Sequence, residues 1–433
     1  MPTPLYDAVR RYIETGPVRA HTPGHCGDAA PLSCLKDILK WDVTEARTLD
    51  SLYHPDGPIA QAEALASDYF GTAATLFCAG GNTLALQTML ALALRRGQTL
   101  LCGRNVHASV INTCALLQVQ LAFVSPDPDD QFRIQPADIR QALQKYRPAA
   151  VLVTSPNYYG AVSDIAAIAA LCQKYGVPLL VDNAHGTHLR LFGRHPISLG
   201  AAMSADSAHK TLPVLTGGAF LQLNDPSYTA AAKQKMALFG STSPSYPILL
   251  SLDLARAYCA EQNAADAYQQ AARQVSLLKQ AAHTRGIPTV DGDCDPMRLT
   301  LDTGCNGRQT ADLLWQHGVS CEMWDDRYVV LLFTPFHTPV QMEVVYNALQ
   351  YCPPAGTPAE LPIWDNTPVL PPWEALNRDT QAVSPEHSAG HIAAQTVFCC
   401  PPGIPAVLPG ERISQNTARF LKNSSISGVL VVK

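Results

Sequence analysis

Apolar runs alternate with stretches of helical periodicity between about residues 70 and 221 of the chain. The periodic stretches predict helices over 84–94 and 165–175. The apolar runs predict strands over 99–102, 149–154 and 179–181. Because the strands lack polar alternation, both faces of their sheet are expected to be covered. The pattern is typical of a parallel α/β core, in which ligands bind at the carboxyl ends of the strands.

The pattern changes after this core. An alanine-rich helix is predicted over about 247–285, and strands are predicted near 298–301 and 329–333. Prolines recur from 353 to 372 and are expected to form an extended connection. We therefore expect an N-terminal segment (1–60), a large domain (61–285), a small α+β domain (286–352), a Pro-rich linker (353–380) and a C-terminal module (381–433).

The composition is that of a compact protein that works on small molecules. With 433 residues the chain exceeds the size of one ordinary core, and 47% of its residues are hydrophobic while 15% are charged. A formal net charge of −5 provides no basic surface for nucleic acid or an anionic membrane. No segment is typical of a signal peptide or a membrane span, so a cytoplasmic protein is expected.

The 13 cysteines are scattered along the chain. They contain no C-x-x-C pair, and only Cys399 and Cys400 are adjacent. An odd number of cysteines without metal-ligand spacing favours reduced thiols over disulfides. We therefore expect neither a zinc site nor another metal site.

The strongest chemical signal is the combination of Lys210 with Asp182. Asp182 ends the apolar run Leu179–Asp182, and Lys210 lies in the turn-prone stretch Ser207–Pro213. A lysine amine holds the aldehyde of pyridoxal phosphate as a Schiff base, and a buried carboxylate keeps the pyridine nitrogen of that cofactor protonated. Because most lysines are surface charges, it is the pairing that favours a pyridoxal phosphate site.

A glycine turn precedes the predicted helix 84–94. Its sequence, Gly80-Gly81-Asn82-Thr83, places backbone N–H groups and two polar side chains at a helix N-terminus, which suits a phosphate group. An ordinary helix cap by Asn82 or Thr83 is the alternative interpretation. The presence of Lys210 favours the phosphate.

Three histidines lie close to these stretches. His107 follows the strand predicted at 99–102, so its ring is positioned to lie on a flat cofactor. His185 follows Asp182 by three residues, and His209 directly precedes Lys210. A lone histidine is more often a packing or surface residue, and each of the three has that alternative, or the alternative of orienting a neighbour.

Six stretches resemble, in order, the signatures of a known family. They are His21–His25, Tyr53–Ile59, Ser155–Gly160, Ser207–Pro213, Ser241–Tyr246 and Pro401–Pro405. The series resembles the Orn/Lys/Arg decarboxylases, which are pyridoxal phosphate enzymes of the aspartate aminotransferase fold group, fold type I. The resemblance implies a three-layer α/β large domain with a mainly parallel sheet, plus a smaller α+β C-terminal region.

The resemblance also implies roles for individual residues. Lys210 would hold the cofactor, Asp182 would pair with its pyridine nitrogen, and His107 would stack on its ring. The implied cofactor-binding set also contains Gly81, Asn82, Thr83, Ser207 and His209, which would hold the phosphate, and His185. Because the active sites of this fold group lie between subunits, a homodimer or higher even oligomer is implied, with Ser241 and Thr242 reaching the partner's cofactor.

The chain departs from the family pattern at several positions. Gly80-Gly81-Asn82 stands where the family usually has Asn-Gly-Ser/Thr, and Asn183 stands where Glu is usual. Ala108 replaces the lysine of His-Lys-Ser, and Cys26 replaces the lysine after Pro-Gly-His. The departures leave Lys210 and Asp182 in place. The chain resembles the short form of the family, without an N-terminal wing domain.

The predicted reaction is loss of the α-carboxylate from arginine, lysine or ornithine as CO2. Either Lys210 or a nearby histidine would return a proton to Cα. An aminotransferase or lyase on the same fold is one alternative, because a fold does not fix the reaction. A catalytically silent paralogue that binds amino acids or partner subunits is the other.

Charged residues of the later segments are candidates for substrate recognition. A basic substrate side chain needs an acidic receptor, and Asp325, Asp326 and Glu411 are available by type, although surface roles are commoner for such residues. An aminotransferase would hold the substrate carboxylate with an arginine fork, for which Arg298 and Arg327 are available. The sequence does not separate the three basic substrates.

Overall fold

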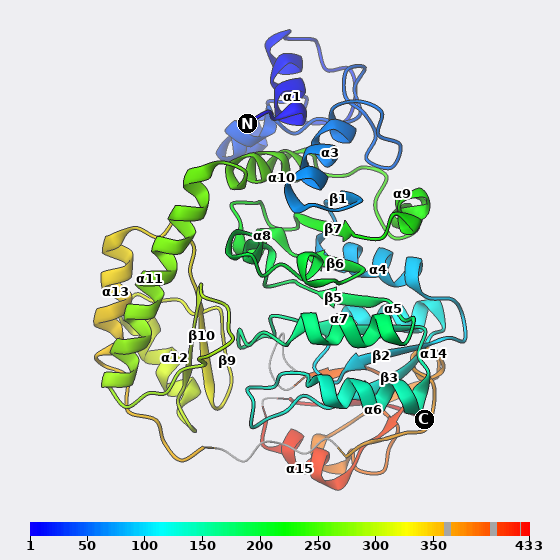
Figure 1. The fold of residues 1–433 in the computed structure, drawn as a ribbon, viewed down its shortest axis with the longest axis vertical. Coiled ribbons are helices and arrows are strands. Elements are labelled where there is room, and N and C mark those ends of the chain that lie inside the picture. Colours follow the sequence, from blue (N-terminus) through cyan, green and yellow to red (C-terminus); the bar gives the residue numbers. More distant parts are fainter. Residues whose placement is uncertain (359–364, 399–404, 425) are drawn as a thin grey trace. The chain divides into compact units, whose positions relative to one another are not determined.

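The computed structural model describes residues 1–358, 365–398, 405–424 and 426–433 (Figure 1). The chain forms two compact units, and each combines separate stretches of sequence. The first unit contains Met1–Ala93 and Pro178–Gln269, and the second contains Leu94–Val177 and Gln270–Lys433. Three sequence predictions concern positions outside the described residues: most of the last family signature (401–404), the pair Cys399-Cys400, and Pro362 of the linker.

Four of the seven strands of the large sheet belong to the first unit. Their order is β1 (Ala74–Cys78), β7 (Ala219–Leu223), β6 (Met203–Asp206) and β5 (Leu179–Asp182). β5 and β6 are parallel, whereas β7 is antiparallel to both of its neighbours. Every residue of β5, β6 and β7 is buried, as expected for strands without polar alternation.

The first unit also contains helices. They are α1 (Pro4–Glu14), α2 (Lys36–Leu39), α3 (Pro58–Phe70), α4 (Gly81–Ala93), α8 (Ala208–Thr211), α9 (Thr229–Ala237) and α10 (Tyr246–Cys259), together with the start of α11 (Gln262–Thr284). α4 packs against β6, β7 and α9, and it buries an almost unbroken apolar sequence from Leu84 to Leu92. α3 packs against β1, and α10 packs against α1 and α3. α4 thereby forms a well-packed core with β6 and β7.

The second unit supplies the other three strands of the large sheet. They are parallel and lie in the order β4 (Ala150–Thr154), β2 (Thr99–Gly103) and β3 (Gln120–Val124). Their connecting helices are α5 (Ala108–Leu117), α6 (Pro136–Tyr146) and α7 (Ile165–Lys174). The predicted mainly parallel α/β sheet is confirmed, and β7 is its antiparallel exception.

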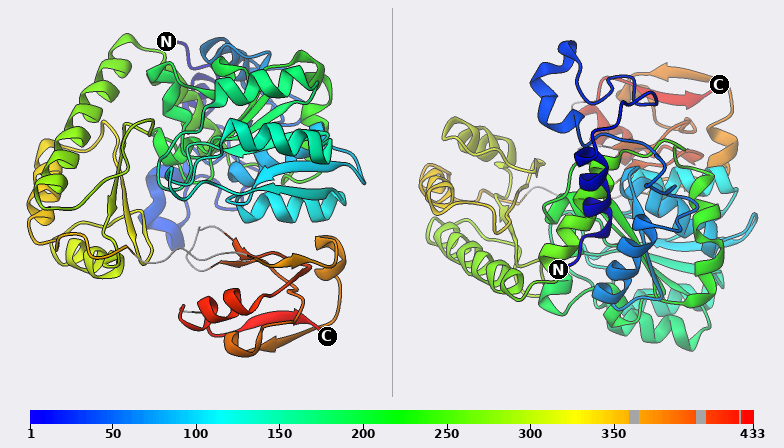
Figure 2. Two further views of the ribbon diagram at one scale, coloured as in Figure 1. Left: turned by 60° about the horizontal axis from the view of Figure 1, so that its bottom comes forward. Right: turned by 90° about the horizontal axis from the view of Figure 1, so that it is seen from above.

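A small antiparallel sheet follows in the second unit, in the order β8 (Arg298–Asp302), β10 (Tyr328–Leu332) and β9 (Met323–Trp324). α11, α12 (Gly307–Gln316) and α13 (Pro339–Leu349) lie beside it (Figure 2). Leu299, Leu314, Val329 and Leu349 are fully buried in their common core. The strands predicted near 298–301 and 329–333 are β8 and β10 of this α+β arrangement.

The C-terminal part of the second unit contains short paired strands. The pairs are β11 (Thr367–Pro368) with β15 (Glu411–Arg412), β12 (Thr380–Val383) with β16 (Val429–Val432), and β13 (Val397–Phe398) with β14 (Pro405–Val407). The helices are α14 (Pro372–Ala375), whose Pro372 occupies the first turn, and α15 (Gln415–Lys422). Ala406, Leu421 and Val431 are among the fully buried residues of this part.

One element prediction is wrong. The single helix expected over 247–285 is two helices, α10 and α11, separated at Ala260 and Glu261. Neither glycine nor proline marks the break, so the helical periodicity runs through it. The predicted segment boundaries stay a prediction.

In the part of the chain that the structure describes, no helix combines the length and the apolar character needed to cross a membrane.

Candidate active site

Asp182 lies at the carboxyl end of β5, with only 2% of its surface exposed. Its Oδ1 atom accepts hydrogen bonds from Asn82 Nδ2 at 2.9 Å and from the backbone N–H of Ala184 at 3.3 Å. A carboxylate oxygen accepts hydrogen bonds and an amide nitrogen donates them, so the contact fixes which end of the Asn82 amide faces Asp182. The acid is therefore held in one orientation by a residue 100 positions away in the sequence.

Lys210 lies on the one-turn helix α8, which follows β6. Its Nζ atom lies 3.2 Å from Nε2 of the buried residue His185. So short a helix has no stability of its own. Tyr268 holds its end, because the phenolic O–H donates to the carbonyl of Thr211 at 2.7 Å. The first unit thus combines an amine and an imidazole with the carboxylate of the Asp182 strand end.

The turn before α4 belongs to the same unit. Gly81 has φ +72°, a conformation that favours glycine, and its N–H donates to the carbonyl of Gly217 at 2.8 Å. Asn82 is half-buried and Thr83 is exposed in the first turn of the helix. First-turn N–H groups lack acceptors within their own helix, so they are available to a ligand or a cap.

The stretch before Lys210 is held by side-chain contacts. Ser207 is buried, and its Oγ lies 3.3 Å from Nδ1 of His209. The same Nδ1 lies 3.1 Å from the carbonyl oxygen of Gly218, which also accepts the backbone N–H of His209. Because a carbonyl only accepts, this contact favours the His209 tautomer with its proton on Nδ1.

A buried polar network lies behind these residues, and the sequence did not reveal it. Asp206, which is fully buried at the end of β6, accepts from Asn183 at 2.9 Å and contacts His195 Nε2 at 2.7 Å. Ser204 and Gln222 also donate to its carboxylate. An acid at a buried strand position next to Ser207 is the one signal that could have pointed to it.

His107 belongs to the second unit, where it is the N-cap residue of α5. Its Nδ1 accepts the backbone N–H of Ser109 at 3.1 Å. Arg104 in the preceding turn donates to Glu411 at 3.0 Å and to the carbonyl of Pro405 at 2.9 Å. These contacts join the turn that carries His107 to the C-terminal part. Burial raises the pKa of the Glu411 carboxyl.

The other predicted residues occupy different surroundings. Ser241 and Thr242 are exposed between α9 and α10, and the Ser241 carbonyl accepts the Tyr53 hydroxyl at 3.0 Å. Their predicted contact with a partner subunit stays a prediction.

The candidate acidic receptors already serve as hydrogen-bond acceptors. Asp325 accepts the Tyr159 hydroxyl at 2.8 Å and the backbone N–H groups of Arg327 and Tyr328. Glu411 accepts from Arg104 and from the backbone N–H of Leu408. Asp326 is exposed.

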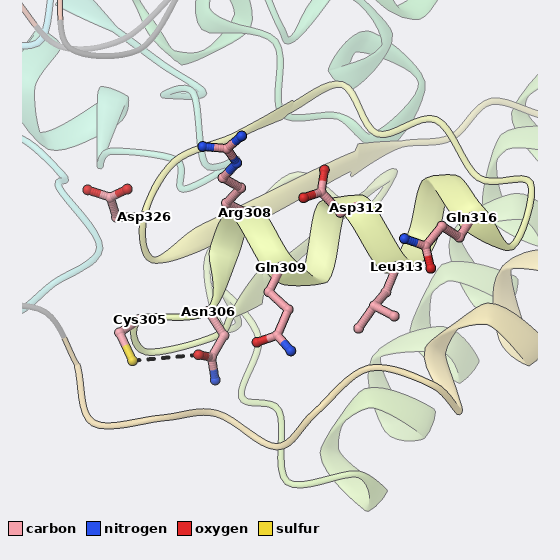
Figure 3. A pocket seen from close by; sticks show the side chains of 8 residues that line it. All are labelled: Cys305, Asn306, Arg308, Gln309, Asp312, Leu313, Gln316 and Asp326. Atoms are coloured by element: carbon pink, nitrogen blue, oxygen red, sulfur yellow. Dashed lines mark hydrogen bonds between the residues drawn. The ribbon is translucent and has the colours of Figure 1, made fainter. Parts of the chain in front are cut away.

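A surface pocket of the second unit runs along α12 (Figure 3). Asp326 is the one sequence candidate among its lining residues. The other lining residues are Cys305, Asn306, Arg308, Gln309, Asp312, Leu313 and Gln316. The pocket thus contains neither Lys210 nor Asp182.

Comparison with known families shows the family to which the chain belongs. Residues 3–294 match the family model described as Orn/Lys/Arg decarboxylase, major domain, and residues 364–426 match the C-terminal domain of the same family. The chain belongs to the Orn/Lys/Arg decarboxylase family. This Orn/Lys/Arg decarboxylase is accordingly a pyridoxal phosphate-dependent amino acid decarboxylase, and the predicted family, enzyme class and cofactor are confirmed.

Similar proteins cover nearly the whole of this decarboxylase. The uncharacterized protein YaaO of Bacillus subtilis (strain 168) is 33% identical over 97% of this chain and 94% of its own length. An arginine decarboxylase of Halalkalibacterium halodurans is 29% identical over 99% of this chain and 94% of its own length. Lysine decarboxylase A from Pseudomonas aeruginosa has a TM-score of 0.84 at 18% identity, covering 99% of this chain and 80% of that chain, which shows the shared fold. The predicted fold type I architecture is confirmed.

The residues of the first unit fit pyridoxal phosphate. Lys210 provides an amine and Asp182 a buried carboxylate, the two groups that the cofactor aldehyde and pyridine nitrogen require. Oδ1 of Asn82 is a buried acceptor without a hydrogen-bond partner among the described residues, beside Asp182. A buried acceptor in that state is costly unless a donor reaches it, as a bound ligand would.

Proposed function

We propose that the chain converts arginine to agmatine and CO2, with the first unit holding the cofactor. The observation that carries the proposal is the Lys210–His185 contact in the same unit as the buried carboxylate of Asp182. Arginine is proposed because several relatives that align over most of this chain are named arginine decarboxylases. One proton is consumed for each CO2 released.

Each residue would hold one part of the cofactor. Lys210 would attach its aldehyde carbon, and Asp182 would keep its pyridine nitrogen protonated. Ser207 and the first-turn N–H groups of α4 would bind its phosphate, whereas the stacking role of His107, a residue of the second unit, stays a prediction of the family resemblance. When bound, pyridoxal phosphate supplies an electron sink for the pair of electrons left by the departing carboxylate.

Lys210 and His185 would share the proton transfers. At 3.2 Å from Nζ, Nε2 of His185 is positioned to take a proton from the lysine ammonium, which leaves a nucleophilic amine. The same two atoms would hold the proton that replaces CO2 at Cα. His185 is buried and Lys210 is half-buried, which limits the access of bulk water to this exchange.

The contacts of two arginines argue against an aminotransferase. Arg327 directs its guanidinium at Asp302, with contacts of 2.9 and 2.6 Å. Arg298 is buried, lies 3.5 Å from Asp295 and donates to the Tyr158 carbonyl at 2.9 Å. A guanidinium that already holds a protein group is a poor receptor for a substrate carboxylate.

The silent-paralogue alternative is set aside because the family assignment makes the chain an enzyme.

A homodimer is part of the proposal. The exposed Ser241 and Thr242 are available to another chain, as the family resemblance implies. Each site would then combine Lys210 of one protomer with Ser241 and Thr242 of its partner.

Two experiments test the proposal. Borohydride reduction of the loaded enzyme, followed by peptide mass spectrometry, should place the pyridoxyl group on Lys210, and a label on another lysine would contradict the assignment. Equimolar arginine, lysine and ornithine should yield agmatine faster than cadaverine or putrescine. Faster formation of either other amine would reassign the substrate.

A further inference from the structure

We infer that Asn82 positions the Asp182 carboxylate and does not bind the cofactor phosphate, the role that the family resemblance implies for it. The inference rests on the proposed function, since it assigns the two ends of one cofactor to different residues. It concerns a position where this chain departs from the usual Ser/Thr of the family, so a different side chain is expected to do different work.

The contact itself is direct. Asn82 Nδ2 donates to Oδ1 of Asp182 at 2.9 Å, and both residues belong to the first unit. Asp182 is buried, so a hydrogen bond from a neutral donor is stronger here than at the surface. Together with the N–H of Ala184, the amide holds one carboxylate oxygen at a fixed position. The acid is thereby oriented before any cofactor arrives.

The amide chemistry makes Asn82 a poor phosphate ligand. Phosphate oxygens accept hydrogen bonds, so only the Nδ2 end of an asparagine side chain can bind them. That end gives one of its two N–H donors to Asp182, so a phosphate oxygen on the other donor would lie beside the negative charge of the Asp182 carboxylate. The other end, Oδ1, is a buried acceptor without a partner among the described residues, and it would repel a phosphate oxygen. The side chain is therefore suited to a carboxylate on one side and a donor on the other.

The glycine turn is then divided between two tasks. Thr83 and the first-turn N–H groups of α4 remain for the phosphate. Asn82 joins the same helix to the carboxylate at the end of β5. The first turn of α4 would thus position both the phosphate and the pyridine end of the cofactor.

Cofactor affinity with and without the phosphate separates the two roles. Apo wild type, Asn82→Ala and Thr83→Val are titrated with pyridoxal phosphate and with pyridoxal, which lacks the phosphate. Asn82→Ala should weaken both ligands by the same factor, about tenfold for a lost hydrogen bond to a charged group. Thr83→Val is the matched control and should weaken pyridoxal phosphate selectively. Loss of pyridoxal phosphate affinity alone in Asn82→Ala would overturn the inference.

Two further variants keep the test decisive if Asn82→Ala folds poorly, as judged by far-ultraviolet circular dichroism. Asn82→Thr restores the usual family residue and should raise the preference for pyridoxal phosphate over pyridoxal, and an unchanged preference would count against the inference. In an Asp182→Ala background, Asn82→Ala should cause no further loss of pyridoxal affinity, and a full additional loss would overturn it.

Failure of the proposed function has a different signature. If wild type and Lys210→Ala show the same absorbance spectrum with pyridoxal phosphate, the assignment of Lys210 fails whatever the Asn82 variants do. If wild type alone shows the Lys210-dependent spectrum, the affinity ratios of the Asn82 variants decide the inference by themselves.

Discussion

At the scale of single residues, a buried carboxylate organises a polar network next to the candidate site. Asn183 occupies the position where the family usually has Glu, and the buried acid beside it is Asp206, which accepts the Asn183 amide at 2.9 Å. Asp206 also contacts His195, and it is the last residue of β6, shortly before the one-turn helix that carries Lys210. The network ties the ends of β5 and β6 together.

Asp206→Ala should lower the free energy of unfolding by about 3 to 5 kcal/mol, because it leaves the buried donors of Asn183, His195 and Gln222 without their acceptor. Urea unfolding of the apo protein measures the change. The exposed Asp266→Ala is the matched control and should stay within about 0.5 kcal/mol of wild type.

The exchanged pair Asn183→Asp/Asp206→Asn should recover part of this loss, since it keeps one carboxylate and one amide facing each other. A double variant less stable than Asp206→Asn alone would show that Asn183 and Asp206 do not act as a pair.

Candidate site residues could be proposed from the sequence where residue type and local order indicate them. Lys210 and Asp182 were proposed because a lysine turn and a strand-ending acid each have a local pattern, and their roles stay predictions. The Asn82–Asp182 contact was not found, because hydrogen bonds between residues 100 positions apart leave no spacing signal. His195 was missed because nothing in the local sequence distinguishes a buried histidine from an exposed one.

At the scale of elements, the β9–β10 hairpin depends on Asp325. Its carboxylate accepts two backbone N–H groups of the turn and the hydroxyl of Tyr159, which follows β4. Burial raises the pKa of Asp325, and the nearby Asp326 raises it further, although these hydrogen bonds oppose the shift. The stability of the hairpin is therefore expected to depend on pH.

A raised pKa means that the folded protein holds the proton more tightly than the unfolded chain does. The stabilising effect of that proton is complete below the unfolded value of about 3.9 and is lost as the pH rises through the raised folded value. Asp325→Asn should therefore gain stability relative to wild type as the pH rises through this window. Urea unfolding from pH 4 to 7 tests this, with the exposed Asp312→Asn as control. Parallel curves for wild type and Asp325→Asn would contradict the account.

Elements with strong periodicity were predicted closely. The strand expected at 99–102 is Thr99–Gly103, and the helix expected at 165–175 is Ile165–Lys174, which Asp164 caps through the N–H of Ala167. The break between α10 and α11 was not predicted, because alanine-rich sequence on both sides hides a change of direction.

At the scale of the whole molecule, the central expectation is an active site shared by two protomers. Inactive subunits carrying Lys210→Ala are mixed with inactive subunits carrying Ser241→Trp, after unfolding and joint refolding. Random pairing should restore about a quarter of wild-type activity, because half of the dimers contain one intact site of two. A mixture no more active than its components would place Lys210 and the required Ser241 turn in the same protomer.

The fold class and family were predictable from the order of the motifs, whereas the division into units was not. The chain enters the second unit at Leu94, returns to the first at Pro178 and leaves it again after Gln269. Hydrophobic periodicity is local, so it carries no information on which stretches pack into one unit.

The central claim is that Lys210 serves the release of a substrate carboxylate, and product analysis tests it most directly. Wild type and Lys210→Ala are incubated with pyridoxal phosphate and carboxyl-13C-labelled arginine in D2O, and products are measured by mass spectrometry. The account predicts labelled CO2 and agmatine with one deuterium at Cα from wild type, and neither from the variant. Unlabelled CO2, a keto acid, or equal agmatine from both proteins would contradict it.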